Sequence, residues 1–357
     1  MMNKKPQTAA HDRVRDSGGA AKNRIALVLV LSVALLGVCA VLAIGIGSVY
    51  IPPGKVVEAL FSPAAAGSTE QIIITNMRLT RVIASIFGGG ALALSGLLLQ
   101  ILFQNPIADP YVLGISSGAR LFVGLVMLGG LTLGFHTSSP WFLFLGALAG
   151  ALTVMGIVLL FALRMKSVVT LLIVGTMLGY LCTALVNLLV AFSDDHAIAD
   201  FTRWGMGSFG LMTWAQIQVL VLVCSVIFLL SFLLTKSLNS LMLGEAYAKT
   251  MGVNTRQLRM VMILFSGVLT GVVTAFAGPV AFIGMSVPHI CRLLLKTEDN
   301  RFLLPAVILV GGVFGLVCDL IARTVASPGE LSVGTITSFV GVPIVLFLLV
   351  KKNKVSL

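Results

Sequence analysis

Residues 97–118 read Leu-Leu-Leu-Gln-Ile-Leu-Phe-Gln-Asn-Pro-Ile-Ala-Asp-Pro-Tyr-Val-Leu-Gly-Ile-Ser-Ser-Gly. This stretch ends one apolar helix and begins another, with prolines at positions 106 and 110 between them. Each proline lacks a backbone donor and disfavours helical geometry at the residue before it. The stretch therefore predicts two apolar helices joined by a polar connection that is broken twice.

Within a membrane such a connection has few possible surroundings. An unpaired peptide group in hydrocarbon costs several kcal/mol, so irregular backbone occurs only inside protein or beside a water-filled cavity. The connection is therefore a candidate for a transport path or its gate. An ordinary cytoplasmic turn is the alternative that the local chemistry leaves open.

The composition places the whole chain in a membrane. Of its 357 residues, 58% are hydrophobic and only 10% are charged, whereas soluble proteins carry roughly 25% charged residues. A membrane-spanning helix needs about 20 mostly apolar residues. The sequence predicts an all-α integral membrane protein with about ten transmembrane helices, at residues 25–49, 81–103, 112–131, 140–163, 167–192, 214–234, 260–282, 287–295, 302–325 and 333–350.

The net charge of +11 reflects membrane topology and does not indicate nucleic-acid binding. Basic residues next to span ends mark the cytoplasmic side and contact anionic lipid. They precede the first span and follow the last (Lys4, Lys5, Arg13, Arg15, Lys22, Arg24; Lys351, Lys352, Lys354). We therefore expect a disordered cytoplasmic tail at residues 1–23, a permease domain at 24–352 and a second cytoplasmic tail at 353–357.

The sequence offers no catalytic or metal-ligating cluster. Its five cysteines lie in apolar stretches without a Cys-x-x-Cys pair, which is typical of free buried cysteines. His289 stands alone, and Asp194, Asp195, His196 and Asp200 follow no ligand spacing, so we expect a structural histidine and a solvated loop. The sequence also lacks a Gly-x-x-x-x-Gly-Lys-Ser/Thr phosphate loop. If ATP drives this protein, another subunit must bind it.

Five motifs follow one another along the chain. They are Arg78-Leu79-Thr80-Arg81; Asn105–Gly114 with Ser116-Ser117-Gly118-Ala119; Gly278–Gly284 leading to Val287-Pro288-His289; Asp319-Leu320-Ile321-Ala322-Arg323; and Glu330–Gly334 leading to Gly341-Val342-Pro343. Together they resemble the permeases of ABC importers for iron-siderophores, haem and cobalamin, over roughly residues 25–352. The resemblance implies the permease of a type II ABC importer: a homodimer with one path lined by spans five and ten, two ATPase subunits that bind ATP and Mg, and a substrate-binding protein.

Three arginines depart from the positive-inside bias, because Arg78, Arg81 and Arg323 all fall at outer span ends. Arginine suits carboxylate recognition, and exposed charges steer an oppositely charged partner. In the similar family the matching arginines receive acidic residues of the binding protein, so the resemblance implies a docking role. Alternatively, Asp319 pairs with Arg323 while the other two snorkel to lipid headgroups.

A cytoplasmic segment at about residues 237–255 resembles the coupling helices that dock on the ATPase. Gly244 separates two short amphipathic helices, and Gly252 ends the second. The residues expected to carry the coupling are Leu241, Leu243, Gly244, Glu245, Ala246 and Gly252. A plain connecting loop is the alternative.

The resemblance also places a cytoplasmic gate at Asn105 and Ile107, together with Val168 and Val169 at the junction of spans four and five. Arg120 lies within span three, where the similar permeases carry a small or apolar residue. An ionisable residue at membrane depth is a functional candidate. It either meets an anionic substrate in the path or pairs with a buried acid such as Asp109.

A short internal echo relates the two halves of the chain. Residues 106–116 (Pro-Ile-Ala, then Leu-Gly-Ile-Ser) are loosely repeated at 279–286 (Pro-Val-Ala-Phe-Ile-Gly-Met-Ser), on opposite sides of the expected membrane. Opposite orientation is what an inverted repeat produces. A chance match is the other explanation.

The function that this sequence favours is ATP-driven import of an iron chelate, a ferric siderophore or haem, into the cytoplasm across the inner membrane. Cobalamin is the alternative substrate. An ion-coupled secondary transporter would need buried acids, for which only Asp109 and Asp319 are candidates. A membrane enzyme would need clustered polar catalytic residues, which the sequence does not supply.

Overall fold

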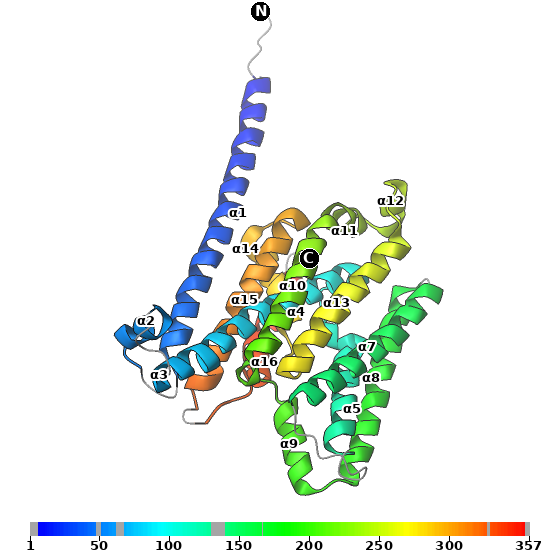
Figure 1. Cartoon of the computed structure of the whole chain (residues 1–357). Helices are drawn as coiled ribbons and strands as arrows, with labels where there is room; N and C mark the ends of the chain where they lie inside the picture. Colours follow the sequence, from blue (N-terminus) through cyan, green and yellow to red (C-terminus); the bar gives the residue numbers. More distant parts are fainter. Residues whose placement is uncertain are drawn as a thin grey trace, which may run out of the picture.

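The computed structural model describes residues 6–47, 51–61, 68–129, 140–165, 167–326 and 329–353, and within them every regular element is helical. Figure 1 shows long helices packed side by side, with short helices at both ends of the bundle. The secondary structure and its apolar composition confirm an all-α membrane protein.

The ten expected spans correspond one for one to apolar helices in the described part of the chain. Seven are long enough to cross a membrane: α1 (Pro6–Gly45, apolar from Lys22), α4 (Thr80–Phe103, continuous with α3 at Thr69–Ile72 and η2 at Ile73–Leu79), α7 (Pro140–Arg164), α8 (Val168–Ala191), α10 (Trp214–Leu233), α13 (Thr255–Ala277) and α15 (Asn300–Thr324). Three are shorter: α5 (Ile115–Met127), α14 (Ile283–Leu295) and α16 (Val333–Asn353). The remaining elements are α2 (Pro53–Phe61), η3 (Pro110–Leu113), α9 (Asp195–Gly205), η4 (Phe209–Leu211), α11 (Thr235–Met242) and α12 (Glu245–Thr250).

The first helix differs from its expected start. Residues 6–23 continue α1 as helix, although the sequence predicts a disordered tail there, and residues 1–5 lie outside the described residues. Once the apolar span has nucleated a helix, each further residue adds one hydrogen bond at little cost. The tail at 353–357 is described only at Asn353, where α16 ends.

The helix that ends in the opening stretch, α4, lies at the centre of the bundle. It is enclosed by α10, α13, α14 and α15 (Figure 1), and 83% of its apolar window is buried. By contrast, only 17% of the corresponding windows of α1 and α8 is buried. The broken connection after α4 therefore begins in the protein core, while α8 has a large surface free for lipid or for another chain.

Small residues allow the core helices to approach closely. A Cβ atom on Gly96 of α4 would lie 2.0 Å from the carbonyl oxygen of Gly284 in α14. That oxygen belongs to the backbone, so a side chain at position 96 would push the two helices apart. Such contacts are typical of membrane helix pairs, whose packing has little hydrophobic driving force.

Gly96→Ala should therefore lower the melting temperature of the detergent-purified protein, because overpacking costs about 1–3 kcal/mol. The matched control is Gly156→Ala on α7, where a Cβ would have no heavy atom within 4 Å. That control should be neutral or stabilising by up to about 1 kcal/mol, since alanine is the better helix former. Equal effects of the two substitutions would contradict the close contact between α4 and α14.

The two echoed segments occupy corresponding places in the order of helices. They touch each other, however, so at this contact they are not separated on opposite sides of the membrane as expected. Each follows a long helix, α4 or α13, and each precedes a helix of 13 residues, α5 or α14. The backbone N–H of Val280 donates a hydrogen bond to the hydroxyl oxygen of Tyr111, which joins the segments directly. In each half a long helix, the echoed segment and a helix of 13 residues follow one another in the same order. The inverted repeat itself stays a prediction.

Candidate functional site

At one end of the bundle Arg81 lies between two carboxylates. Its Nε donates to both carboxylate oxygens of Asp319 at 2.9 Å, and its Nη1 donates to those of Glu330 at 2.9 and 3.0 Å. The Asp319 side chain is fully buried, whereas that of Glu330 is 51% exposed. Sequence reasoning missed Glu330 as a partner, although it stands in one of the quoted motifs, eleven residues after Asp319 (330 − 319).

The other two arginines hold the end of α1. Arg78 Nη1 donates to the carbonyl oxygens of Ile44 and Gly45 at 2.8 and 2.9 Å, and Arg323 Nη2 donates to that of Ala43 at 2.6 Å. Cations stabilise the carbonyl end of a helix, where the last acceptors lack partners and the dipole is negative. These contacts explain why two arginines lie at this end of the bundle.

The burial of these arginines corrects an expectation. Their side chains were expected to face the surface, yet Arg78, Arg81 and Arg323 are only 5%, 7% and 5% exposed. The alternative expectation, an Asp319–Arg323 pair, holds only at 3.9 Å, and the shorter pair is formed with Arg81. In this structure the three side chains bind the protein itself.

At the opposite end, α11 and α12 form the expected pair of short helices. Gly244 (φ +113°) and Gly252 (φ +80°) flank α12, and a Cβ at either position would meet no heavy atom within 4 Å. Leu243 is 68% exposed and Ala246 is also exposed. The exposed apolar surface continues over Tyr247 and Met251, and Tyr247 was missed although it lies four residues after Leu243.

Leu241 does not belong to this surface. It is buried in the core, and its backbone carbonyl accepts a hydrogen bond of 3.4 Å from Gln104 Nε2. Leu238 is also buried, so the two leucines share the inner face of α11 three residues apart. The expectation of an exposed contact at Leu241 is therefore corrected. Leu238, three residues earlier, was the signal in the sequence that Leu241 belongs to a buried helix face.

A cavity of about 270 Å³ brings two of the four expected gate residues, Val168 and Val169, next to the segment expected to couple to the ATPase. It is lined by Leu102, Phe103, Gln104, Val168, Val169, Leu241, Glu245, Thr255 and Arg259. Val169 is 67% exposed and Ile107 is 47% exposed. Asn105 accepts a hydrogen bond of 3.0 Å from the backbone N–H of Ile107. Val168 and Val169 thus adjoin the coupling residues, while Asn105 and Ile107 lie on the turn that follows Gln104.

Arg120 makes a contact that neither expectation named, and a role toward an anionic substrate stays a prediction. Its guanidinium carbon lies 5.4 Å from the ring centroid of Phe201 on α9, within cation–π distance. The Asp109 carboxylate accepts instead from the backbone N–H of Tyr111 at 2.9 Å and caps η3. The expected Arg120–Asp109 pair is not among the ion pairs of the described residues.

The described residues hold no group of three His, Cys, Asp or Glu side chains that could bind a metal ion. His289 Nδ1 lies 3.2 Å from Arg292 Nη1, whose guanidinium also donates to the Gln100 side chain at 2.7 Å. The histidine therefore belongs to a polar contact between α4 and α14.

Ten apolar helices, a cavity beside their broken connection and a pair of glycine-hinged helices define a multi-pass transport permease. Residues 35–351 match the profile of the FecCD transport family. The chain belongs to the FecCD transport family, as an ABC importer permease.

Named relatives and solved structures agree with this assignment. The vitamin B12 import system permease protein BtuC of Klebsiella pneumoniae subsp. pneumoniae is 36% identical over 325 residues, which are 91% of this chain and 92% of the relative. The protein of that name from Salmonella typhi is 35% identical over 326 residues, 91% and 94% of the two chains. A structure assigned to a metal-chelate type ABC transporter in an inward-facing conformation is 30% identical, with a TM-score of 0.78 over 90% of this chain and 98% of that one.

A more distant structure shares the fold alone. The PsaBC complex of Streptococcus pneumoniae contains a chain that is 16% identical, with a TM-score of 0.51 over 83% of this chain and 94% of that one.

Proposed function

We propose that this permease imports a metal chelate into the cytoplasm, driven by ATP hydrolysis on separate ATPase subunits. The observation that carries the proposal is the position of α12. It lies between Gly244 and Gly252, and the exposed side chains of Tyr247 in α12 and of Leu243 just before it point outward. It also adjoins the cavity that Val168 and Val169 line. A partner that moves α12 would therefore act next to the expected gate.

The surface of α8 supports a second permease copy. Val169, Ile173, Met177, Tyr180, Leu181, Leu185 and Leu188 are exposed at steps of about one helical turn. Phe339 on α16 is exposed as well. Two copies meeting along α8 and α16 would cover these faces and enclose one path, as expected for a homodimer.

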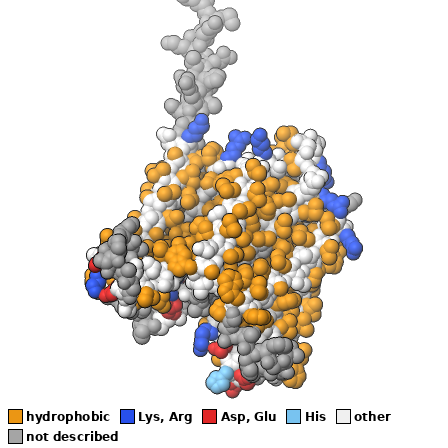
Figure 2. Space-filling view, viewed as in Figure 1, with side chains coloured by type: hydrophobic (Ala, Val, Ile, Leu, Met, Phe, Trp, Pro, Cys, Tyr) orange, Lys and Arg blue, Asp and Glu red, His pale blue; other side chains and the backbone are white. Residues whose placement is uncertain are grey.

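The charge distribution supports the proposed orientation in the inner membrane. Figure 2 shows a broad hydrophobic surface with Lys and Arg side chains along the edge where Figure 1 places α11 and α12. At the opposite end it shows a histidine and acidic side chains, with basic side chains beside them. Basic residues mark the cytoplasmic side. We therefore place α11, α12 and both termini in the cytoplasm and α9 outside.

The buried arginines keep a proposed docking role for the binding protein, but in a modified form. Arg81 is held by Glu330, whose half-exposed carboxylate occupies the position that a partner's carboxylate would take. Glu330→Gln removes this competing negative charge while Asp319 still pairs with Arg81.

Glu330→Gln should therefore tighten docking of the binding protein, most clearly at low salt, where screening is weakest. The measurement is the affinity of the purified transporter complex for its binding protein at two salt concentrations. The conservative control Asp200→Asn alters an exposed acid on α9 that pairs only at 3.3 Å with exposed Arg203. An affinity that Glu330→Gln leaves unchanged at both salt concentrations would show the cluster to be structural only.

Among metal chelates we favour cobalamin. The relatives at 35–36% identity are named as import permeases for vitamin B12, which is cobalamin. The expectation of an iron chelate is supported only by membership of the family. Proteoliposomes that contain the complete complex and its binding protein should take up radiolabelled cyanocobalamin with ATP, in preference to haem or a ferric hydroxamate. Uptake of an iron chelate in place of cyanocobalamin would overturn this choice within the class.

A further inference from the structure

Helix α12 is attached to the bundle at few points. Gly244 and Gly252 at its ends have backbone conformations that other residues rarely adopt, and open space surrounds both. Between them Ala248 is buried, while Leu243, just before the helix, and Tyr247 are exposed. The side chain that ties α12 to the neighbouring helix α13 is that of Glu245.

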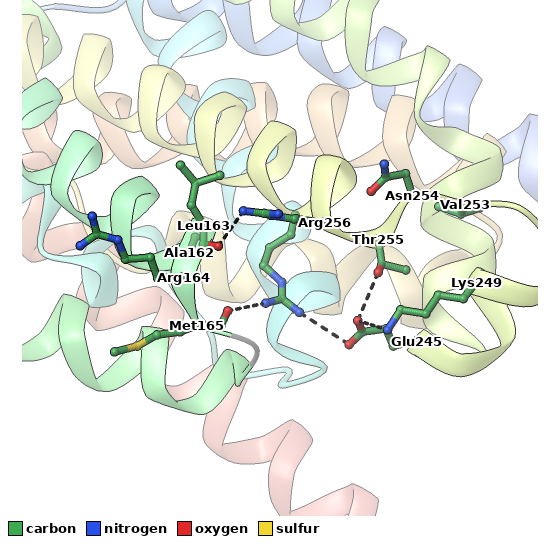
Figure 3. Close-up of a pocket in the computed structure, with 11 residues that line it drawn as sticks. Ala162, Leu163, Arg164, Met165, Glu245, Lys249, Val253, Asn254, Thr255 and Arg256 are labelled. Atoms are coloured by element: carbon green, nitrogen blue, oxygen red, sulfur yellow. Dashed lines mark hydrogen bonds and ion pairs between the residues drawn. The ribbon is translucent and has the colours of Figure 1, made fainter.

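The Glu245 carboxylate contacts Thr255 and Lys249, as Figure 3 shows, and also Arg259, at the edge of a cavity of about 550 Å³ that these residues line. Its carboxylate accepts from Thr255 Oγ1 at 3.2 Å, and it lies 3.0 Å from Lys249 Nζ and 3.6 Å from Arg259 Nη2. The hydrogen bond from Lys249 lowers the pKa of Glu245, so the carboxylate is ionised at neutral pH. Two of these contacts connect α12 to α13.

Arg259 continues the connection toward the expected gate. While Nη2 faces Glu245, Nη1 donates to the backbone carbonyl of Met165 at 3.2 Å. Met165 follows the last residue of α7 and stands just before α8, which begins at Val168. The Arg259 side chain is only 11% exposed, so the planar guanidinium is held in a fixed orientation between both partners.

We propose that Glu245 and Arg259 form the link that transmits displacement of α12 to the connection between α7 and α8. This inference rests on the proposed function and names two positioning residues for it. The ion pair of Glu245 with Arg259 is 3.6 Å long, and the Arg259 side chain is largely buried, so water screens the attraction less than at the surface. A shift of Glu245 therefore pulls the guanidinium and changes its contact with Met165. The movement then reaches Val168 and Val169, the first two residues of α8, which begins three residues after Met165.

Two neighbouring contacts supply matched controls. The Lys249–Glu245 pair lies within α12, so this contact does not itself join α12 to α13. Arg256 Nη2 donates to the carbonyl of Leu163 at 2.8 Å, so it ties α13 to α7 without touching α12. Lys249→Gln and Arg256→Gln each remove one charge from the same cavity and leave the proposed link in place.

The test uses the complete transporter in proteoliposomes with its binding protein. Glu245→Gln and Arg259→Met should lower the amount of substrate imported per ATP hydrolysed by about fivefold or more, the lower end of typical coupling energies. The two controls should stay within about twofold of the wild type, below that range. Arg259→Lys keeps a charge near Glu245 without the guanidinium fork, and its coupling should fall between the two groups.

A second readout reports the movement directly. Val169→Cys places a thiol at the expected gate, whereas Cys39, Cys182, Cys224, Cys291 and Cys318 are all buried. Labelling of that thiol should change between nucleotide-free and ATP-bound complexes, and Glu245→Gln should abolish the change without lowering the melting temperature. A nucleotide response in Glu245→Gln equal to that of the parent would overturn the link. Absence of ATP-driven import by the wild type would overturn the proposed function instead.

Discussion

Asp319→Asn should destabilise the folded permease by about 3–5 kcal/mol, the range for a buried ion pair that loses one partner. Asp319 is fully buried, and its oxygens lie 2.9 Å from Arg81 Nε and 3.9 Å from Arg323 Nε. Asparagine keeps the shape but removes the charge, which leaves two buried guanidinium groups close together. The melting temperature of the purified protein in detergent measures the effect.

The matched control is Glu330→Gln, in which Arg81 loses its half-exposed carboxylate partner but keeps Asp319. Partly exposed pairs contribute about 0–1 kcal/mol because water and salt screen them, so this variant should melt close to the wild type. If Asp319→Asn were as mild as Glu330→Gln, the buried acid would not be what stabilises the two guanidinium groups.

Gly244→Pro should abolish coupled import while the helical bundle stays folded. Gly244 has φ +113° and ψ 149°, a region that is almost restricted to glycine, whereas proline fixes φ near about −65°. The turn between α11 and α12 would have to rearrange, which displaces the exposed surface around Leu243. Import per ATP hydrolysed, measured in the complete complex, should fall to background.

Gly244→Ala separates the backbone effect from crowding. A Cβ at this position would meet no heavy atom within 4 Å, so its cost of about 1–3 kcal/mol comes from backbone conformation alone. Coupling should be reduced less than by proline. If both substitutions left import per ATP unchanged, this segment would be a connecting loop without a role in coupling.

The membrane spans were predictable from sequence because hydropathy and length depend only on local composition. Every expected span has its helix, from α1 to α16, including the short α14. The extension of α1 through residues 6–23 was not predictable in this way, because polar composition indicates low burial but does not exclude helix.

The burial of Arg81 was not predictable from the sequence. Topology rules indicate how deep in the membrane a residue lies, but they do not say whether its side chain faces lipid or other helices. Its partners Asp319 and Glu330 come from positions 238 and 249 residues further along the chain. Arg78 and Arg323 bind carbonyls at the end of α1, and backbone acceptors leave no trace in side-chain patterns.

Arg120 illustrates the same difficulty within the bundle. The sequence singles it out as an ionisable residue within an expected span, but its contact with Phe201 depends on how α9 folds back over α5. The two short helices α11 and α12 were easier to predict, because two glycines and an amphipathic pattern are local signals. What sequence could not supply there is the contact of Arg259 with the Met165 carbonyl, which joins α13 to the end of α7.

The energy source of import tests the central claim most directly. Proteoliposomes should be prepared with this permease, its ATPase subunits and its binding protein, and uptake of the chelate should be followed with internal ATP or with an imposed proton or sodium gradient. We expect uptake with ATP, and its complete loss when the ATPase carries a substitution that blocks hydrolysis. Uptake driven by either ion gradient, with the ATPase inactive or absent, would contradict the account.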